Sequence, residues 1–192
     1  MLSIVLGTTS ASAQGAVAQG GGVGEYELKA AFLYNFAKFV EWPAAGQQEE
    51  FTLCVIGGNP FGAALNPLSS SPVRGRAVVV TRLSDPEEIS RCNMLFVDAL
   101  ALDRLPVILQ RSRDAHVLTV ADIDGFTRRG GMIGLVSEDN RIRFDINTRA
   151  ANDAGLRVSS RLLSLARRVL GDGTSGTAGA EGVGSGMEGN RP

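Results

Sequence analysis

The chain has 192 residues, which is the size of one ordinary domain with room for short flanking segments. Hydrophobic residues make up 44% of it, and the formal net charge is −1 at pH 7. This composition excludes a disordered chain, and the near-zero net charge gives no sign of a nucleic-acid binder.

The first residues of the chain predict an exported protein. A short apolar run is followed by small residues that end in Ala11, Ser12 and Ala13, the A-x-A pattern of a signal-peptidase site. No basic residue precedes the apolar run, which departs from the usual pattern. We expect a secretory signal peptide over 1–13.

Two flanking segments lack the apolar residues that a packed core needs. Residues 14–24 are rich in Gly and Ala, and residues 171–192 are richer still in Gly. Neither segment buries enough apolar surface to offset the entropy lost on ordering. We therefore predict a flexible linker, a disordered tail, and one folded domain over 25–170.

The segment between Leu28 and Pro43, LKAAFLYNFAKFVEWP, predicts a helix that other elements cover on most sides. On a helical projection its apolar residues occupy well over half of the circumference. Because Pro43 disfavours helical geometry at the preceding residue, we expect the helix to stop at or just before Trp42. The residues expected to form its exposed polar stripe are Glu27, Tyr34, Lys38 and Glu41.

Two polar residues, Lys29 and Asn35, fall inside the apolar sector of this helix. An unpaired polar group there would be costly. We expect each to have a partner or to extend to solvent.

Short apolar runs alternate with helical or loop segments through the middle of the chain. The predicted strands are Phe51–Ile56, Ala77–Arg82, Met94–Val97 and Val117–Val120. The predicted helices between them are Phe61–Leu65 and Asp103–Arg111. Continuous β-branched runs separated by helices indicate a mainly parallel sheet that is covered on both faces.

The last part of the domain predicts a hairpin and two helices. Strands at Met132–Ser137 and Arg141–Ile146 flank a turn, and the second strand alternates apolar with charged residues, which is typical of an antiparallel pair with one wet face. Helices are predicted over Thr148–Ala154 and Val158–Leu170, with a break at Gly155. The predicted fold is an α/β layered sandwich: a mixed, mainly parallel sheet covered by helices, with a C-terminal β-hairpin and helices.

The two cysteines are Cys54, inside the first predicted strand, and Cys92, just before the third. In an exported chain an even pair implies a disulfide, whereas in a cytosolic chain both would more often be small buried hydrophobic residues. The predicted export favours the bond. Its role would be structural, because neither cysteine belongs to a CxxC pair.

Signatures of an enzyme are largely missing. The single histidine, His116, cannot form a metal cluster alone and is interpreted as a strand-edge residue. The segment Gly57–Gly62 fits neither common phosphate-binding motif and is interpreted as a turn. Asp122 and Asp124 are interpreted as turn residues before Gly125. We expect no catalytic residue, no metal site and no cofactor.

Positive charge is concentrated near the end of the domain. Between Arg128 and Arg168 there are nine arginines and four acidic residues, a net charge of about +5. The candidates for contact with an anionic ligand or an acidic partner are Arg128, Arg129, Arg141 and Arg143. The alternative, that these arginines simply line solvated faces of a hairpin and helices, stays open.

Five segments of the chain, taken in order, resemble the YfiR family. They are KAAFLYNFAKFVEWP, FTLCVIG, VLTVADIDGF, GGMIGLVSEDNRIRFDIN and AGLRVSSRLLSLARRV, and they span about 25–170. Known members of that family are small periplasmic proteins that inhibit a membrane-bound diguanylate cyclase and so restrain cyclic-di-GMP signalling and biofilm formation. The resemblance therefore implies a periplasmic, non-enzymatic regulator. Some members carry a second cysteine pair that this chain lacks.

Under this resemblance the expected partner is the extracytoplasmic domain of a membrane diguanylate cyclase. The candidate contact residues are Tyr34, Lys38, Glu41 and Trp42, of which Trp42 is expected to be exposed, because aromatic residues contribute strongly to interfaces. Further candidate partners are an outer-membrane lipoprotein and a second copy of the chain; no nucleic acid is expected. The alternative function is a sensor that binds a small ligand at the carboxyl ends of the strands and serves a histidine kinase or an outer-membrane uptake system.

Overall fold

The computed structural model describes residues 23–43, 49–139 and 141–171. The predicted signal peptide over 1–13, most of the predicted linker, and the predicted tail beyond residue 171 lie outside the described residues. The helices are α1 (Val23–Phe39), α2 (Leu105–Asp114), α3 (Thr148–Asp153) and α4 (Ser160–Leu165), with 3₁₀ turns η2 (Asn66–Ser70), η3 (Pro86–Arg91), η4 (Ala99–Arg104) and η5 (Phe126–Arg129). Within the described ranges, no helix is both long enough and apolar enough to span a membrane.

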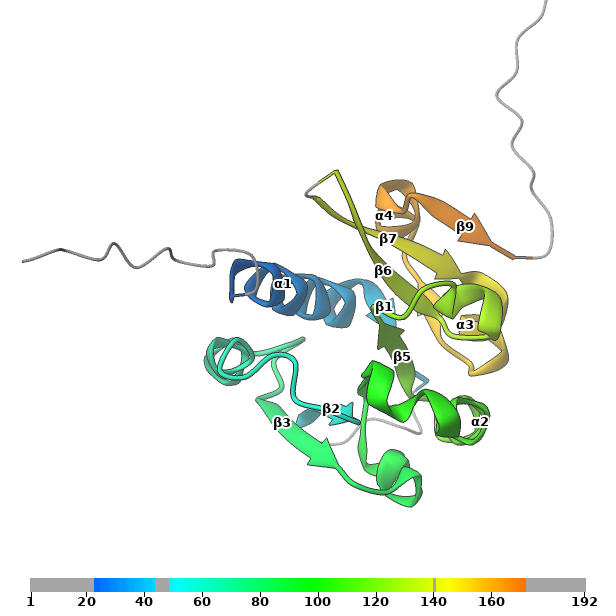
Figure 1. Cartoon of the computed structure of the whole chain (residues 1–192). Coiled ribbons are helices and arrows are strands. Elements are labelled where there is room, and N and C mark those ends of the chain that lie inside the picture. Colours follow the sequence, from blue (N-terminus) through cyan, green and yellow to red (C-terminus); the bar gives the residue numbers. More distant parts are fainter. Residues whose placement is uncertain (1–22, 44–48, 140, 172–192) are drawn as a thin grey trace, which may run out of the picture.

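Seven strands form the central sheet (Figure 1). In spatial order they are β3 (Val78–Leu83), β2 (Phe51–Ile56), β4 (Met94–Val97), β5 (Leu118–Ala121), β6 (Ile133–Glu138), β7 (Arg141–Asn147) and β9 (Arg168–Leu170). The strands from β3 to β6 run parallel, β7 is antiparallel to β6, and β9 is parallel to β7. The predicted mixed, mainly parallel sheet is confirmed.

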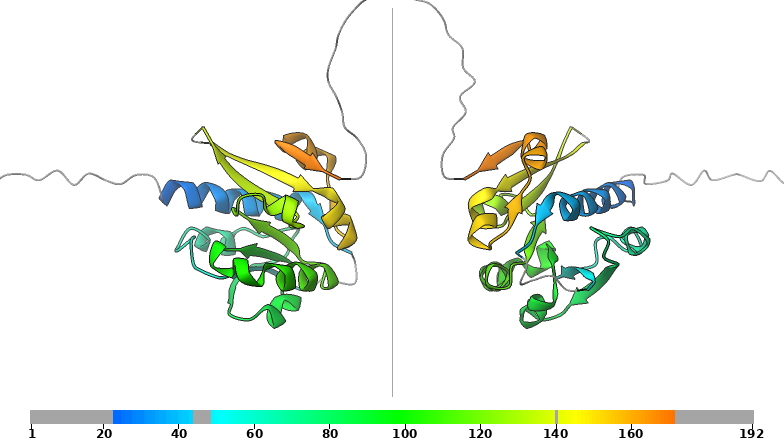
Figure 2. Two further views of the ribbon diagram at one scale, coloured as in Figure 1. Left: turned by 45° about the vertical axis from the view of Figure 1, so that its right-hand side comes forward. Right: turned by 180° about the vertical axis from the view of Figure 1, so that it is seen from behind.

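Alternate side chains of the parallel strands build two hydrophobic layers. Leu53, Met94 and Val120 point to the face that α1 covers, where Phe36 of α1 is fully buried. Their strand neighbours, such as Leu95, point to the opposite face, which α2 and η3 cover (Figure 2). The continuous apolar runs in the sequence therefore reflect burial on both faces.

The order of the parallel strands creates a switch point. The chain moves from β2 to β3 on one side and then returns to place β4 on the other side of β2. In open α/β sheets, ligands bind outside the carboxyl ends of the strands at such a point. The N-terminal half of α1 and the turn after β2 lie at the carboxyl ends of these strands.

The first helix differs from the prediction at both ends. It begins at Val23, inside the segment predicted as linker, and it ends at Phe39, before the expected stop near Trp42. The following residues form β1 (Val40–Glu41), which pairs antiparallel with β8 (Arg157–Val158). This pairing over a long sequence separation is not visible in the local pattern.

The predicted helix over Val158–Leu170 is wrong. The segment instead forms β8, the short helix α4 and the strand β9. The outer edge of β7 accounts for the difference, because it accepts a hydrogen bond from the Arg167 N–H to the Phe144 carbonyl and pairs with β9. Two members of the predicted apolar stripe, Leu165 and Val169, are 64% and 49% exposed. The segment predicted as a helix at Phe61–Leu65 forms turns before η2.

Candidate functional site

An ion-pair cluster around the buried Lys29 holds the start of α1 against the carboxyl end of β5. The Lys29 side chain is 5% exposed, and its Nζ lies 2.6 Å from Asp122 Oδ2 and 2.8 Å from Glu25 Oε1. The Nζ also lies 4.3 Å from the centre of the Tyr26 ring. The expectation that Lys29 has a partner is confirmed, and Asn35 reaches solvent.

Burial and contacts within this cluster shift the pKa of Lys29, Glu25 and Tyr26. Burial alone would lower the pKa of Lys29, but its hydrogen bonds to Asp122 and Glu25 outweigh burial and raise it. The hydrogen bond from Lys29 lowers the pKa of Glu25. Burial, with the charge of Asp122, raises the pKa of Tyr26. Lys29 and Glu25 therefore carry opposite charges across the neutral range, and the contacts of Lys29 with Glu25 and Asp122 act as a clamp on α1.

A hollow of about 830 Å³ lies beside this clamp. α1 contributes Tyr26, Ala30 and Ala31 to its wall, and the segment after β2 contributes Phe61 and Pro67. The Tyr26 and Phe61 rings meet edge to face with centroids 5.3 Å apart. The wall is mostly apolar, and its volume is within the range of small-molecule sites.

One face of α1 is left uncovered by the rest of the described domain. The exposed residues along it are Glu27, Leu28, Ala31, Asn35 and Lys38. Leu28 is 46% exposed although the remainder of the helix is largely core. The predicted covering of α1 on most sides therefore holds for Phe36 and its neighbours but is wrong for Leu28 and Ala31.

Three of the predicted partner contacts lie at or near this surface. Lys38 and Glu41 are exposed, and Tyr34 is half-buried with its hydroxyl donating to the Pro72 carbonyl at 3.2 Å. Lys38 Nζ lies 5.2 Å from the Tyr34 ring centre. Their role in binding stays a prediction.

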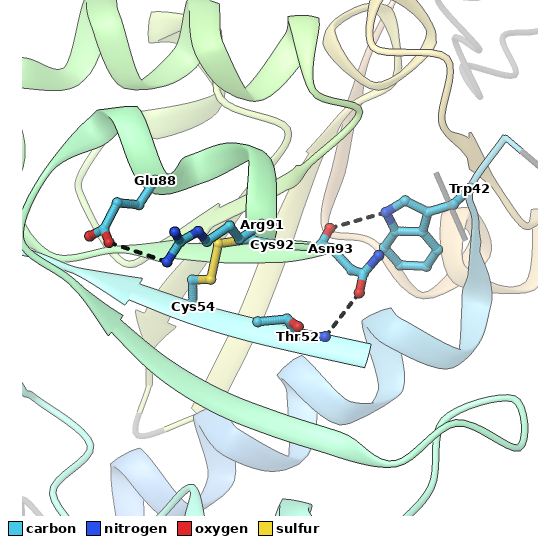
Figure 3. The surroundings of a disulfide bond; sticks show 7 residues. All are labelled: Trp42, Thr52, Cys54, Glu88, Arg91, Cys92 and Asn93. Atoms are coloured by element: carbon cyan, nitrogen blue, oxygen red, sulfur yellow. Dashed lines mark hydrogen bonds and ion pairs between the residues drawn. A yellow bond between two sulfur atoms is a disulfide. The ribbon is translucent and has the colours of Figure 1, made fainter. Parts of the chain in front are cut away.

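The predicted exposure of Trp42 is wrong. Its side chain is buried, and its Nε1–H donates to the carbonyl oxygen of Asn93 at 3.0 Å (Figure 3). The Asn93 side chain in turn accepts the Thr52 N–H. The Trp42 ring also packs edge to face on Phe51 with centroids 5.4 Å apart. Trp42 thus joins the end of α1 to the sheet and is not available on the surface.

The predicted disulfide between Cys54 and Cys92 is confirmed (Figure 3). It joins β2 to the residue that precedes Asn93 and β4, with a Cα–Cα distance of 5.9 Å. Both residues are buried in the layer under α2 and η3. The bond therefore lies on the face of the sheet opposite α1.

The four predicted arginines do not converge on one point. Arg128 and Arg129 are exposed in η5, whereas Arg141 and Arg143 are exposed on the hairpin. Arg143 Nε lies 3.7 Å from Glu138 Oε2 within the hairpin. Of these four, Arg128 alone lines a hollow of about 400 Å³ between η5 and β9, to which Arg167 and Arg168 also contribute.

The sequence analysis missed one arginine, Arg167, that two hydrogen bonds hold in place. Arg167 forms two hydrogen bonds with Asp145, at 2.9 and 2.7 Å, and Asp145 is buried in β7. The contact with Asp145 raises the pKa of Arg167. Because the pair joins two strands that are far apart in the sequence, no local pattern identifies it. The ion pair holds the chain in place just before β9, so Arg167 is not a free cation.

Two titratable residues that the sequence analysis interpreted as non-catalytic, His116 and Asp122, have structural partners. His116 Nδ1 lies 2.8 Å from the Ala154 carbonyl oxygen, Asp122 pairs with Lys29, and Gly125 has the positive φ expected of its turn. In the turn after β2 the Gly58 N–H donates to Asp98 Oδ1 at 2.9 Å, so a carboxylate already occupies that donor. No group of three or more His, Cys, Asp or Glu side chains in the described part of the chain is placed to hold a metal ion.

Comparison with known proteins places the chain in context. The sequence profile of a family described as YfiR/HmsC-like matches residues 26–167. No curated protein matches the chain. Among solved structures, a conserved domain protein from Vibrio cholerae O1 biovar El Tor is similar with a TM-score of 0.52 and 9% identity, over 75% of this chain and 60% of that one.

The ABC domain in complex with L-Trp from Streptococcus pneumonia has a TM-score of 0.51 and 11% identity, over 76% of this chain and 60% of that one. The chain thus spans about three fifths of the length of these two structures. At such identities the likeness concerns the α/β fold alone.

Proposed function

The chain belongs to the YfiR/HmsC-like family, and on this basis we propose that it is a periplasmic regulator that restrains a membrane-bound diguanylate cyclase by direct binding. In this role the protein performs no chemistry and acts through the surface that it presents. Cyclic-di-GMP production, and with it biofilm formation, would fall while the complex persists. The observation that supports the proposal most is the family match across nearly the whole described domain.

The exposed face of α1 is the surface that we assign to the partner. Leu28 and Ala31 lie on it between Glu27 and Lys38, so that an apolar centre is flanked by charges of both signs. Interfaces commonly combine an apolar centre with a polar rim. The clamp at Lys29 and the core contacts of Phe36 hold this face rigid, which reduces the entropy lost on binding.

The test is complementation in a host from which the gene has been deleted. Deletion should raise cellular cyclic-di-GMP, and return of the full-length gene should lower it again. Leu28→Glu should fail to lower it, because the substitution places a charge at the apolar centre of the interface. Val107→Glu is the matched control: Val107 is 48% exposed on α2, on the other side of the sheet, against 46% for Leu28.

Capture from solubilised membranes supplies the second readout. The tagged full-length protein should retain a membrane protein with a cytoplasmic GGDEF domain, and Leu28→Glu should weaken its retention by about tenfold or more, the effect expected at an interface hot spot. Equal retention and equal complementation by Leu28→Glu would contradict the assignment of α1. An unchanged cyclic-di-GMP level on deletion would contradict the proposed function itself.

The hollow beside α1 favours a second candidate function, sensing of a small ligand. Its volume of about 830 Å³ and its position near the switch point are those of a small-molecule site. None of the residues that line it is basic, so an uncharged or cationic ligand suits it better than an anion. Ala31→Trp should fill the hollow. A ligand-induced rise in melting temperature that this variant abolishes would support sensing, and its persistence in the variant would argue against this site.

A further inference from the structure

β3 is the edge strand at one end of the sheet (Figure 1). It pairs with β2 in parallel, and the Phe51 N–H donates to the Ala77 carbonyl at the start of this ladder. In a parallel ladder, alternate residues of a strand turn their N–H and C=O groups toward the same neighbour. Residues 77, 79, 81 and 83 therefore face β2, and residues 78, 80 and 82 turn their main-chain groups away from the sheet.

These outward groups form an open ladder. Within the described part of the chain, no backbone hydrogen bond joins the N–H or C=O groups of Val78, Val80 or Arg82 to another segment. Exposed edges are commonly protected by charged side chains, proline, a bulge or short length. β3 has six residues with three consecutive valines and no proline, and its one charged residue is Arg82. Its edge therefore remains open to a further strand that carries the opposite charge.

A hollow of about 490 Å³ runs beside this edge. β3 contributes Val78, Val80 and Arg82 to it, and the segment after β2 contributes Leu65 and Ser69. Val80 is half-buried and packs against the core below the hollow. In strand addition, hydrogen bonds to the edge supply affinity, and pockets for alternate side chains supply specificity. Both elements are present at β3.

Arginines lie along β3 and in the turn before it, at positions 74, 76 and 82, and no acidic residue occurs between residues 71 and 84. The nearest acidic residues follow the strand, at the start of η3. Arg74 and Arg82 are exposed. A second copy of the chain added antiparallel about Val80 would bring its own Arg82 opposite Val78 and close to Arg76. Like charges placed together disfavour that pairing.

From this combination we propose that β3 is a docking site for an extended segment of a partner protein in which apolar residues alternate with acidic ones. The segment adds to β3 as a further strand, and its main chain bonds to Val78, Val80 and Arg82. Because alternate residues of a strand share one face, its carboxylates lie on the face that bears Arg82 and the hollow, and its apolar residues lie on the opposite face beside Val79. This inference is independent of the surface of α1 and of the identity of the regulated enzyme. Either can fail while the other holds.

The test uses a synthetic six-residue peptide in which valine alternates with glutamate, labelled at one end and blocked at both. Binding to the full-length protein is followed by fluorescence anisotropy. Two control peptides separate the causes: one carries N-methyl groups on alternate residues, which removes the donors to the edge, and one has lysine in place of glutamate. Each control should bind at least tenfold more weakly than the acidic peptide.

Variants of β3 locate the site. Val80→Pro removes the outward N–H and leaves the ladder to β2 intact, since proline is tolerated where its nitrogen faces away from the sheet. It should abolish binding, whereas Val80→Thr, which keeps the N–H, should retain it. Arg82→Glu should weaken binding at least tenfold, and Arg82→Lys should not. Emission of the single tryptophan, Trp42, reports whether each variant is folded.

Three outcomes would overturn the proposal. One is the absence of binding at millimolar concentrations of the acidic peptide. Another is equal affinity for the N-methylated peptide, a comparison that does not depend on the folding of any variant. The third is a dimer in sedimentation that Val80→Pro abolishes, which would assign the edge to a second copy of the chain.

Discussion

Removal of the Cys54–Cys92 bond should lower the free energy of unfolding by about 4 kcal/mol. The two residues are separated by 38 positions, and in the chain-entropy model a loop of this length restricts the unfolded chain by roughly that amount at 25 °C. Native domains have total stabilities of about 5–15 kcal/mol. The bond would thus contribute a large share of the stability of this domain.

Two perturbations separate the cross-link from packing. Reduction by dithiothreitol breaks the bond and keeps both sulfur atoms in the core, where Cys54 is 0% and Cys92 is 4% exposed. The double variant Cys54→Ala/Cys92→Ala also removes the sulfur atoms, and we expect it to lose about 1–2 kcal/mol more through lost contacts. A loss on reduction that makes up most of the loss in the double variant would attribute the stabilisation to the cross-link.

Urea unfolding followed by the emission of Trp42 provides the assay. Trp42 is the single tryptophan and is buried, so its emission should change when the fold is lost. The midpoint should fall on reduction, and the slope of the transition should rise, because the unfolded chain without the cross-link is less compact and exposes more surface. A loss below about 1 kcal/mol would refute the reasoning, because it would mean that the unfolded chain is already restricted without the bond.

Three further predictions concern the attachment of α1. Lys29→Met should lower the free energy of unfolding in urea by about 2–3 kcal/mol. This is less than the cost of removing one partner from a fully buried ion pair, because Asp122 keeps some contact with water. An unchanged free energy of unfolding would mean that the clamp does not hold the helix. Trp42→Phe should lower the free energy of unfolding by about 1–2 kcal/mol in the same assay monitored by circular dichroism. The cost is modest because the Asn93 carbonyl keeps its hydrogen bond to the Leu118 N–H. No change would exclude the hydrogen bond from Trp42 to Asn93 as a stabilising contact. Because Lys29 lowers the pKa of Glu25, the stability that the carboxylate contributes is present above the pKa of the unfolded chain, about 4.3, and is lost as pH falls. The free energy of unfolding of the wild type should therefore exceed that of Glu25→Gln by more at pH 6 than at pH 3, and the opposite order would contradict the lowered pKa.

The sheet shows which elements a local sequence pattern can predict. The strands Phe51–Ile56 and Met94–Val97 were predicted with the bounds that the structure has, because a strand buried on both faces appears as a continuous apolar run. The hairpin was predicted because apolar and charged residues alternate in its second strand, as expected when one face is buried and the other is exposed to water. In each case burial of the strand itself determines the residue types.

The C-terminal segment shows where the pattern fails. Val158–Leu170 has helical periodicity, yet its last residues form β9, because β7 has an open edge and Asp145 binds Arg167. A hydrogen-bonding edge and a buried carboxylate outweigh a local preference of a few tenths of a kcal/mol per residue. The burial of Trp42 has a similar cause, since its acceptor, Asn93, is supplied by a distant strand.

The candidate site shows the same division between what the sequence predicts and what only tertiary contacts decide. The sequence by itself determined the fold class, the apolar first helix, the need of Lys29 for a partner, and the cysteine pair. Only the tertiary structure decided which face of α1 stays exposed, which carboxylates hold Lys29, and that β3 lies at the edge of the sheet. Periodicity records how much of an element is buried, whereas the partner that buries it comes from contacts between residues far apart in the chain.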